Sequence, residues 1–178
     1  MRTFKVTIEG VTPLLQHRFT EASEVNGEGG NGTRRVHLKD EDPRDQAERA
    51  CYRGSDGKLF IPGASFTRML REAGGAHKQR GSRKSLKYIV PAAVRITEDA
   101  VPLFTNGKRA VDFEVDSRPV TIPATKGRIM RHRPRLNVWR AEFALAVNET
   151  ILDSDTVKML LDEGGLQIGV GDYRPEKG

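Results

Sequence analysis

The sequence concentrates arginine in one short stretch near residue 130. Six side chains that are cationic or can become so stand together there, separated by Gly127 and Pro134: Lys126, Arg128, Arg131, His132, Arg133 and Arg135. A guanidinium group donates two parallel hydrogen bonds to a phosphate and also stacks on nucleobases, so an arginine-rich stretch favours phosphate binding more strongly than a lysine-rich one. A solvated charged surface is the alternative interpretation of the same residues.

A second basic segment covers residues 77–87 and contains no acidic residue. Its glycine and serine content indicates a loop rather than a helix. Two basic segments are harder to attribute to chance than one, and together they can line one groove for the phosphate backbone. The predicted phosphate contacts of this loop are Lys78, Arg80, Arg83, Lys84 and Lys87.

The positive charge belongs to one part of the chain. Residues 77–140 hold 15 Lys and Arg against 5 Asp and Glu, whereas the remaining residues hold 15 basic and 19 acidic side chains, and the whole chain carries a formal net charge of +6. Such segregation indicates a polyanionic partner. A membrane surface is a weaker alternative, because no long amphipathic helix combines bulky apolar residues with a basic side.

Few residues of the sequence support catalysis. No metal-binding, Walker or dinucleotide motif is present, and the single Cys51 excludes both an intrachain disulfide and a thiolate metal cluster. We therefore expect neither a metal nor another cofactor. The histidines are scattered along the chain: His17, His37, His77 and His132.

Two catalytic alternatives remain open. A metal-independent ribonuclease needs only a base and a cation near a ribose hydroxyl, and either His17, which precedes Arg18, or His132 among its arginines could act as that base. The acidic run Asp40–Asp42 could hold a divalent ion, but it coincides with a predicted helix start, where the helix dipole stabilises carboxylates in any case.

Aromatic residues are too few for extensive base recognition. The chain has one Trp and three Tyr, and the polar face of the first predicted strand carries no aromatic side chain. Trp139 is in register with Phe143 and Leu145, which places it in the core. We expect binding through the nucleic-acid backbone with little base preference.

The apolar periodicity predicts alternating strands and helices. Residues 2–9 alternate as a strand covered on one face, and 136–147 form the clearest strand, which we expect to be central. Helices are predicted from Asp42-Pro43 to about Cys51, from Phe66 to Ala73 with Arg68 and Arg71 pointing away from the core, and after the Asp153 cap. Further strands are predicted around 59–61, 88–96 and 101–104 and from Leu166.

These elements predict an α+β, ferredoxin-like (RRM-like) fold with an antiparallel sheet. The 178 residues fit one such domain, 1–178, with insertions at about 18–42 (a mobile loop), 77–87 (the basic loop) and 105–135 (a projecting β-hairpin whose centre is 111–130). No apolar run is long enough for a membrane helix and no secretory signal is present, so we expect a cytoplasmic, non-membrane protein.

Two further motifs resemble a known family. The run 59–65 (Leu-Phe-Ile-Pro-Gly-Ala-Ser) followed by a helix, and the glycine-rich end 169–178, are similar to motifs of the RAMP superfamily, the ferredoxin-like RNA-binding subunits that form the backbone of CRISPR effector complexes. The resemblance implies that Ser65 and Arg68 lie under an RNA groove, that the 169–178 loop with Arg174 contacts a guide, and that the hairpin 111–130 wedges between bases. The whole pattern is also similar to phage and bacterial proteins.

The sequence departs from the family pattern at two places. The loop after the first strand lacks the Asp of target-cleaving members, which disfavours nuclease activity, and no aromatic-ended strand follows the glycine-rich end, which predicts truncation at Gly178 or a disordered tail. We therefore expect a non-catalytic protein that coats single-stranded nucleic acid, RNA ahead of DNA, as a homo-oligomer or CRISPR-like complex subunit. The alternatives are an endoribonuclease and a phage inhibitor or scaffold protein that binds an acidic protein partner.

Overall fold

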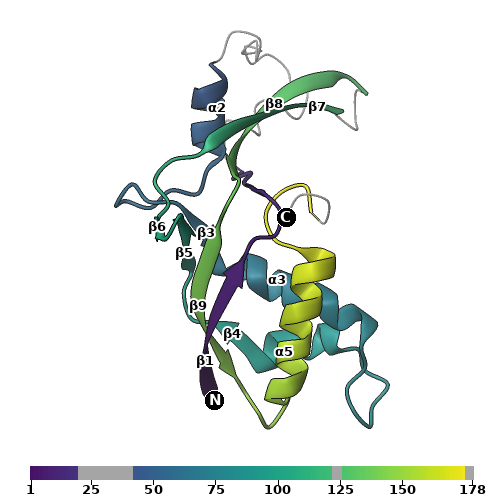
Figure 1. Ribbon diagram of the computed structural model, residues 1–178. Helices are drawn as coiled ribbons and strands as arrows, with labels where there is room; N and C mark the ends of the chain where they lie inside the picture. Colours follow the sequence, from purple (N-terminus) through teal and green to yellow (C-terminus); the bar gives the residue numbers. More distant parts are fainter. Residues whose placement is uncertain (20–41, 122–125, 175–178) are drawn as a thin grey trace, which may run out of the picture.

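The computed structural model describes residues 1–19, 42–121 and 126–174. It is an α+β structure with antiparallel sheets (Figure 1). Most of the loop predicted at 18–42, the tip of the predicted hairpin and the last four residues of the glycine-rich end lie outside these ranges.

The main sheet is built around one long strand. β9 (Arg140–Val147) pairs on one side with β1 (Arg2–Glu9) and on the other with β4 (Val94–Ile96) and β5 (Ala100–Thr105). β5 also pairs with β3 (Phe60–Pro62) and with the short β6 (Lys108–Arg109). Among the described strands, β1 pairs with β9 alone, so its other edge is open.

Two helices lie on the same side of this sheet in Figure 1: α3 (Gly63–Ala73) and α5 (Ser154–Glu163). The ring of Phe66 in α3 lies 4.6 Å from the ring of Phe143 in β9, centroid to centroid, so the two layers share a core. Three short helical segments connect α3 with β4: η1 (Gly74–Ala76), η2 (Leu86–Tyr88) and α4 (Val90–Ala93). A π-helical turn, η3 (Gly164–Ile168), continues α5.

A second, smaller sheet has the order β2 (Leu14–Leu15), β8 (Arg128–Leu136), β7 (Glu114–Thr121). β7 and β8 form the long hairpin at the top of Figure 1, and α2 (Pro43–Ala50) packs against it. α2 begins where Asp42 accepts backbone hydrogen bonds from Arg44 and Asp45 and Pro43 occupies the first turn, an arrangement typical of helix starts.

The structure confirms several elements that the sequence predicts. These include the strand at 2–9, the helices capped by Asp42 and Asp153, the long hairpin and the central strand. The helix predicted from Phe66 to Ala73 is also present, but it begins three residues earlier, at Gly63. Trp139 is 4% exposed and therefore in the core, as predicted. The strand predicted at 136–147 is divided, since Leu136 ends β8 and Arg140 begins β9.

One strand prediction is wrong and another is only partly right. Of the strand predicted around 88–96, only Val94–Ile96 is a strand (β4), whereas 88–93 is mostly helical, because Ser85 accepts the backbone N–H of Lys87 at the start of η2 and Pro91 fits the first turn of α4. Leu166–Ile168 is part of η3 rather than a strand. The glycine pair does not end α5 there, since Gly164 packs closely against Met69 and the helical path continues to Gly169, whose φ of 69° ends it.

None of the helices in the described residues is long and apolar enough to cross a membrane.

Candidate nucleic-acid interface

The β7–β8 hairpin presents four arginines on one face. Successive side chains of a strand point to opposite faces, and the register pairs Arg118 with Arg131 and Asp116 with Arg133, with Arg135 two residues further along β8. We call this surface the arginine face; it consists of Arg118, Arg131, Arg133 and Arg135. Directly opposed like charges such as Arg118 and Arg131 are unfavourable in a sheet unless an anion lies between them.

Two carboxylates neutralise part of this charge. The buried Asp116 forms an ion pair with Arg118 at 2.7 Å and lies 4.0 Å from Arg135. Asp172, from the loop after α5, lies 2.5 Å from Nε of the buried Arg133. Glu114, which the register places opposite Arg135, adds a third carboxylate on this face. Four guanidinium groups thus face three carboxylates, and the face keeps a net positive charge.

Arg131 receives none of this compensation. Its side chain is half-buried and forms no hydrogen bond or ion pair with the described residues. Burial and the neighbouring Arg133 lower the pKa of Arg131 below its usual value, which reflects the cost of holding this charge without a partner. A half-buried guanidinium group of this kind is well suited to bind an anion.

His17 lies beside the arginine face. The pairing of β2 with β8 continues one residue further, where the N–H of Gln16 donates to the carbonyl of Pro134, and this brings His17 next to β8. Burial, together with Arg133 and Arg131, lowers the pKa of His17, although Asp172 opposes the effect. The imidazole is therefore neutral at pH 7, and its buried Nδ1 has no hydrogen-bond partner among the described residues.

The loop after η3 completes the site. The N–H of Asp172 donates to the carbonyl of Leu15, and Gly171 has a φ of 88°, where a Cβ atom would lie 2.6 Å from that same carbonyl oxygen. Only glycine fits this close approach. The loop is thereby fixed against β2, and it places Asp172 and Tyr173 next to Arg133.

The remaining predicted residues of the hairpin lie apart from the arginine face. Lys126 and Arg128 are exposed at the start of β8, beyond the buried part of the site. His132 belongs to the opposite face of the strand, where its Nδ1 lies 2.7 Å from the hydroxyl of Ser117; its backbone N–H donates to Gln46 of α2.

The predicted residues of α3 and the glycine-rich end form a separate group. Arg174 contacts both carboxylate oxygens of Glu72, at 2.9 and 3.2 Å, and Arg68 donates to the same carboxylate. Hydrogen bonds first from Arg174 and then from Arg68 lower the pKa of Glu72 to about 2. Arg68 and Arg174 therefore bind to the protein itself, while Ser65 is partly exposed and Arg71 is exposed.

The basic loop 77–87 does not lie beside the hairpin. It projects from the far end of α3, at the opposite end of the molecule from β7 and β8 in Figure 1. Its base is tied to α5, since His77 lies 2.6 Å from Glu163. Its predicted contacts Lys78, Arg80, Arg83, Lys84 and Lys87 are all exposed. The structure therefore does not bring the two basic segments into one groove.

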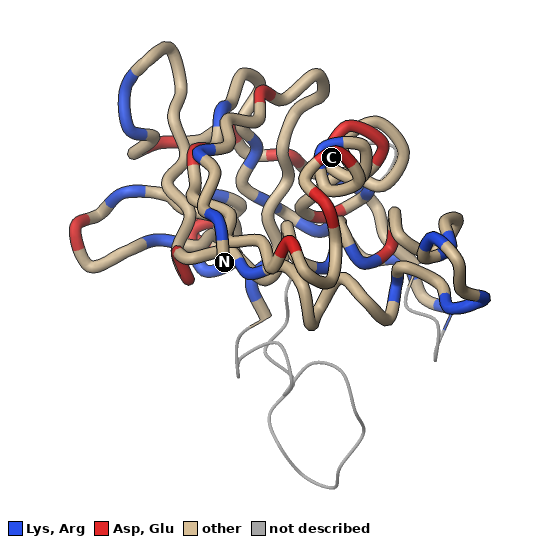
Figure 2. The backbone as a smooth tube through the Cα atoms, turned by 90° about the horizontal axis from the view of Figure 1, so that it is seen from below, with Lys and Arg blue, Asp and Glu red and all other residues tan. Residues whose placement is uncertain are grey.

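Basic positions are spread over several strands and loops in the view from below (Figure 2). Acidic positions are interspersed among them and mark the coil of α5 near the C-terminus. Along the described backbone the basic positions in this view are thus not gathered in one place, and the arginine face differs from them in that Arg133 is buried and Arg118, Arg131 and Arg135 are half-buried.

Sequence reasoning missed four residues of the site: Arg118, Asp116, Asp172 and Tyr173. The first two are separated from the arginine stretch along the chain and are brought to it only by the hairpin register. Asp172 and Tyr173 stand within the glycine-rich motif, and the sequence signal that could have singled out Tyr173 is that it is the single aromatic residue of 169–178.

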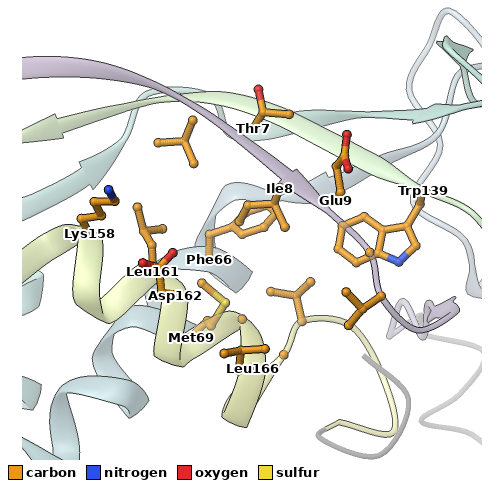
Figure 3. Close-up of a pocket in the computed structure, with 16 residues that line it drawn as sticks. Thr7, Ile8, Glu9, Phe66, Met69, Trp139, Lys158, Leu161, Asp162 and Leu166 are labelled. Carbon is orange, nitrogen blue, oxygen red and sulfur yellow. The ribbon is translucent and has the colours of Figure 1, made fainter.

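A pocket of about 300 Å³ beside the open edge of β1 is the alternative site (Figure 3). Its lining is largely apolar and includes Ile8, Phe66, Met69 and Leu161, with the charged groups of Lys158 and Asp162 on α5. A largely apolar lining does not suit a polyanion. Its polar side chains also provide no nucleophile paired with a base.

Within the described residues, no group of three or more His, Cys, Asp and Glu side chains could hold a metal ion. No protein-family model and no curated protein sequence matches the chain.

Proposed function

We propose that the protein binds single-stranded nucleic acid, without cleaving it, by contacting phosphates with the arginine face. The observation that carries this proposal is Arg131, a half-buried guanidinium group that has no partner among the described residues and lies beside a second guanidinium group. A phosphate bound there would supply the missing negative charge.

The surroundings of Arg131 support a phosphate more than a protein carboxylate. Nη1 of Arg133 and Nδ1 of His17 are buried nitrogen atoms without hydrogen-bond partners among the described residues. Unpaired guanidinium donors, together with an imidazole nitrogen that donates in one of its tautomers, suit the multiple oxygens of a phosphate group, which accept several hydrogen bonds at once. The exposed Lys126 and Arg128 extend the positive charge toward the hairpin tip, where a second phosphate could bind.

The strand order supports the proposal that the fold is ferredoxin-like. β1, β9 and β4/β5, with α3 and α5 on one side, correspond to three adjacent strands and both helices of a ferredoxin-like sheet. Together with the motifs at 59–65 and 169–178, this order supports a relation to the RAMP superfamily, and that resemblance is the reason to place RNA ahead of DNA.

A RAMP-type backbone subunit assembles side by side along the strand, and we extend the proposal to such a homo-oligomer. Multi-angle light scattering with and without a long oligonucleotide tests it. A mass that rises in multiples of the 19.8 kDa chain on the oligonucleotide is expected. A monomeric mass under both conditions would contradict assembly, but not nucleic-acid binding.

The binding proposal is tested by fluorescence anisotropy with 30-nucleotide single-stranded RNA, single-stranded DNA and duplex DNA at several salt concentrations. Tight binding to a single strand that weakens steeply with salt is expected, and the preferred strand decides between RNA and DNA. Absence of binding to all three ligands at physiological salt would refute it and favour an acidic protein partner for the arginine face.

Metal-independent RNA cleavage is a second candidate, favoured by the position of His17. A neutral imidazole beside Arg131 and Arg133 could accept the proton of a ribose 2′-hydroxyl while the arginines hold the phosphate. Cleavage that disappears in His17→Ala and persists in His132→Ala would establish this activity. Intact RNA after prolonged incubation with the wild-type protein would eliminate it.

A further inference from the structure

We infer that Tyr173 is a base-stacking platform, so that the site takes an unpaired nucleotide with its phosphate on the arginine face and its base on the tyrosine ring. This inference rests on the proposed function. It adds the chemical class of ligand that the site selects: a nucleotide whose base is free to leave its stack.

The first observation is the position of the ring. Tyr173 is 39% exposed, which leaves part of its surface open to a ligand. The guanidinium carbons of Arg133 and Arg118 lie 5.1 and 5.6 Å from the ring centroid. Both guanidinium groups lie over the ring, so a nucleotide whose phosphate lies on the arginine face could stack its base on the part of the ring that remains exposed.

The second observation is the backbone of Tyr173. Its φ is 63°. Glycine adopts this conformation without strain, whereas any residue with a Cβ atom does so at a cost in free energy. Gly169 and Gly171 stand nearby at positive φ, yet this third position carries a large aromatic side chain. Strained positions of this kind cluster at functional sites and persist where the surrounding structure holds them in place.

The third observation is that the loop is held in place on both sides. Asp172 bonds to the backbone of Leu15 and pairs with Arg133, and Arg174 binds Glu72 of α3. Tyr173 lies between these two anchors, so its ring is positioned before a ligand arrives. A preordered aromatic side chain loses little conformational freedom when a base stacks on it.

Stacking on one ring explains how a site without base-edge contacts can prefer single strands. Every base has a flat π-face, so stacking tolerates any sequence, whereas a duplex keeps its bases inside the helix. The arginine face alone would bind the phosphates of both forms.

The test compares a normal oligonucleotide with one whose central nucleotides are abasic, using fluorescence anisotropy with single-stranded DNA of 12 residues. Both ligands carry the same phosphates. We expect the wild-type protein to bind the normal strand about tenfold more tightly than the abasic one, since aromatic stacking contributes about that factor per base. Tyr173→Phe keeps the preference, and Tyr173→Leu and Tyr173→Gly reduce it to less than twofold.

The choice of variants separates stacking from folding. Tyr173→Gly relieves the positive φ, so this variant is expected to melt no lower than the wild type while it loses the preference for bases. Tyr88→Leu is the matched control, because Tyr88 is an exposed tyrosine of η2, in the segment between α3 and β4. It is expected to leave both affinities unchanged.

The outcomes distinguish this inference from the proposed function. Equal affinity of the wild-type protein for the two strands, with strong salt dependence, would overturn stacking and leave phosphate binding intact. A base preference that survives in Tyr173→Gly would also overturn it. No binding of either strand, together with no binding of single-stranded RNA of the same length, would refute the proposed function itself, and the inference with it.

Discussion

At the scale of residues, Arg131 and Arg133 occupy adjacent places on one face of β8 but differ in their partners. Arg133 is buried against Asp172, whereas Arg131 is half-buried and has no partner among the described residues. A charge with a buried partner stabilises the fold through that partner, while a charge without one raises the free energy of the folded state. The two residues therefore predict opposite effects of the same substitution.

Replacing Arg131 by Met is expected to leave the free energy of unfolding unchanged or to raise it by about 0.5 kcal/mol, because it removes an uncompensated charge. Arg133→Met is expected to lower that free energy by about 3 kcal/mol, because Asp172 is left partly buried without its partner. Urea denaturation of both variants measures the difference. A loss of stability in Arg131→Met as large as in Arg133→Met would mean that Arg131 has a structural role.

His17 predicts how binding depends on pH. Its pKa is lowered by burial and by Arg133 and Arg131, so the imidazole is neutral at pH 7 and becomes charged only at lower pH. A bound phosphate favours the charged form and raises this pKa, so protonation and binding are linked. Affinity is therefore expected to rise by about threefold between pH 7.5 and 5.5, since a pKa shift of one unit corresponds to at most a tenfold change.

His17→Gln removes this pH-dependent gain, whereas His132→Gln, on the other face of β8, serves as the control and is expected to retain it. Anisotropy titrations at the two pH values with one single-stranded ligand measure both variants. The same gain in His17→Gln as in the wild type would exclude His17 from the site.

The sequence predicts the β8 side of the arginine face but not the β7 side. Arg131, Arg133 and Arg135 are recognisable from their density in the chain. Arg118 and Asp116 are not, because their meaning depends on which residue of β8 each one opposes, and the length of the turn that sets this register is not encoded in the local pattern. Arg68 and Arg174 show the converse: both are basic, but Glu72 binds them.

At the scale of elements, the site exists because three segments meet: β2, the β7–β8 hairpin and the loop that follows η3. Gly171 joins two of them through its close contact with Leu15. This contact makes the loop's path dependent on a single residue without a side chain.

Gly171→Ala is expected to lower the free energy of unfolding by at least about 2 kcal/mol, because the added methyl group meets a backbone oxygen at a positive φ. It is also expected to weaken nucleic-acid binding, since Asp172 and Tyr173 move with the loop. Gly75→Ala is the control, because a Cβ there would meet no atom within 4 Å. Thermal unfolding that is equally affected in both variants would contradict this account of the loop.

The long elements were predictable from periodicity, and the short ones were not. β1, β9, α3 and α5 each have enough residues for the apolar period to be distinct. Leu166–Ile168 has a strand-like alternation over only three residues, which cannot outweigh the close packing of Gly164 on Met69 that prolongs the helical path. The strand predicted around 88–96 is correct only from Val94 on, because the cap at Ser85 and the fit of Pro91 into a helical turn make 88–93 mostly helical within an apolar run.

At the scale of the whole molecule, the two basic segments are separated. The hairpin lies at one end and the loop 77–87 at the other (Figure 1). A short oligonucleotide on the arginine face therefore does not need the loop, whereas a long strand can extend toward it.

Changing Arg83 and Lys84 together to alanine is thus expected to weaken binding of a 30-nucleotide strand by about tenfold and of an 8-nucleotide strand by less than twofold. Anisotropy titrations with both lengths measure this difference. An equal loss with both lengths would place the loop within the same site as the hairpin, and no loss with either would remove the loop from the interface.

The measurement that most directly tests the arginine face compares two double variants that lose the same charge. Arg118→Ala with Arg131→Ala removes two guanidinium groups from the face, and Arg95→Ala with Lys158→Ala removes two exposed cations from β4 and α5. With 8-nucleotide single-stranded RNA, the first pair is expected to weaken binding at least thirtyfold. It is also expected to reduce the slope of log K against log salt concentration by the contribution of about two phosphate contacts. The second pair is expected to weaken binding less than threefold. Equal effects of the two pairs would mean that net charge alone drives binding, and would contradict a phosphate site on the β7–β8 hairpin.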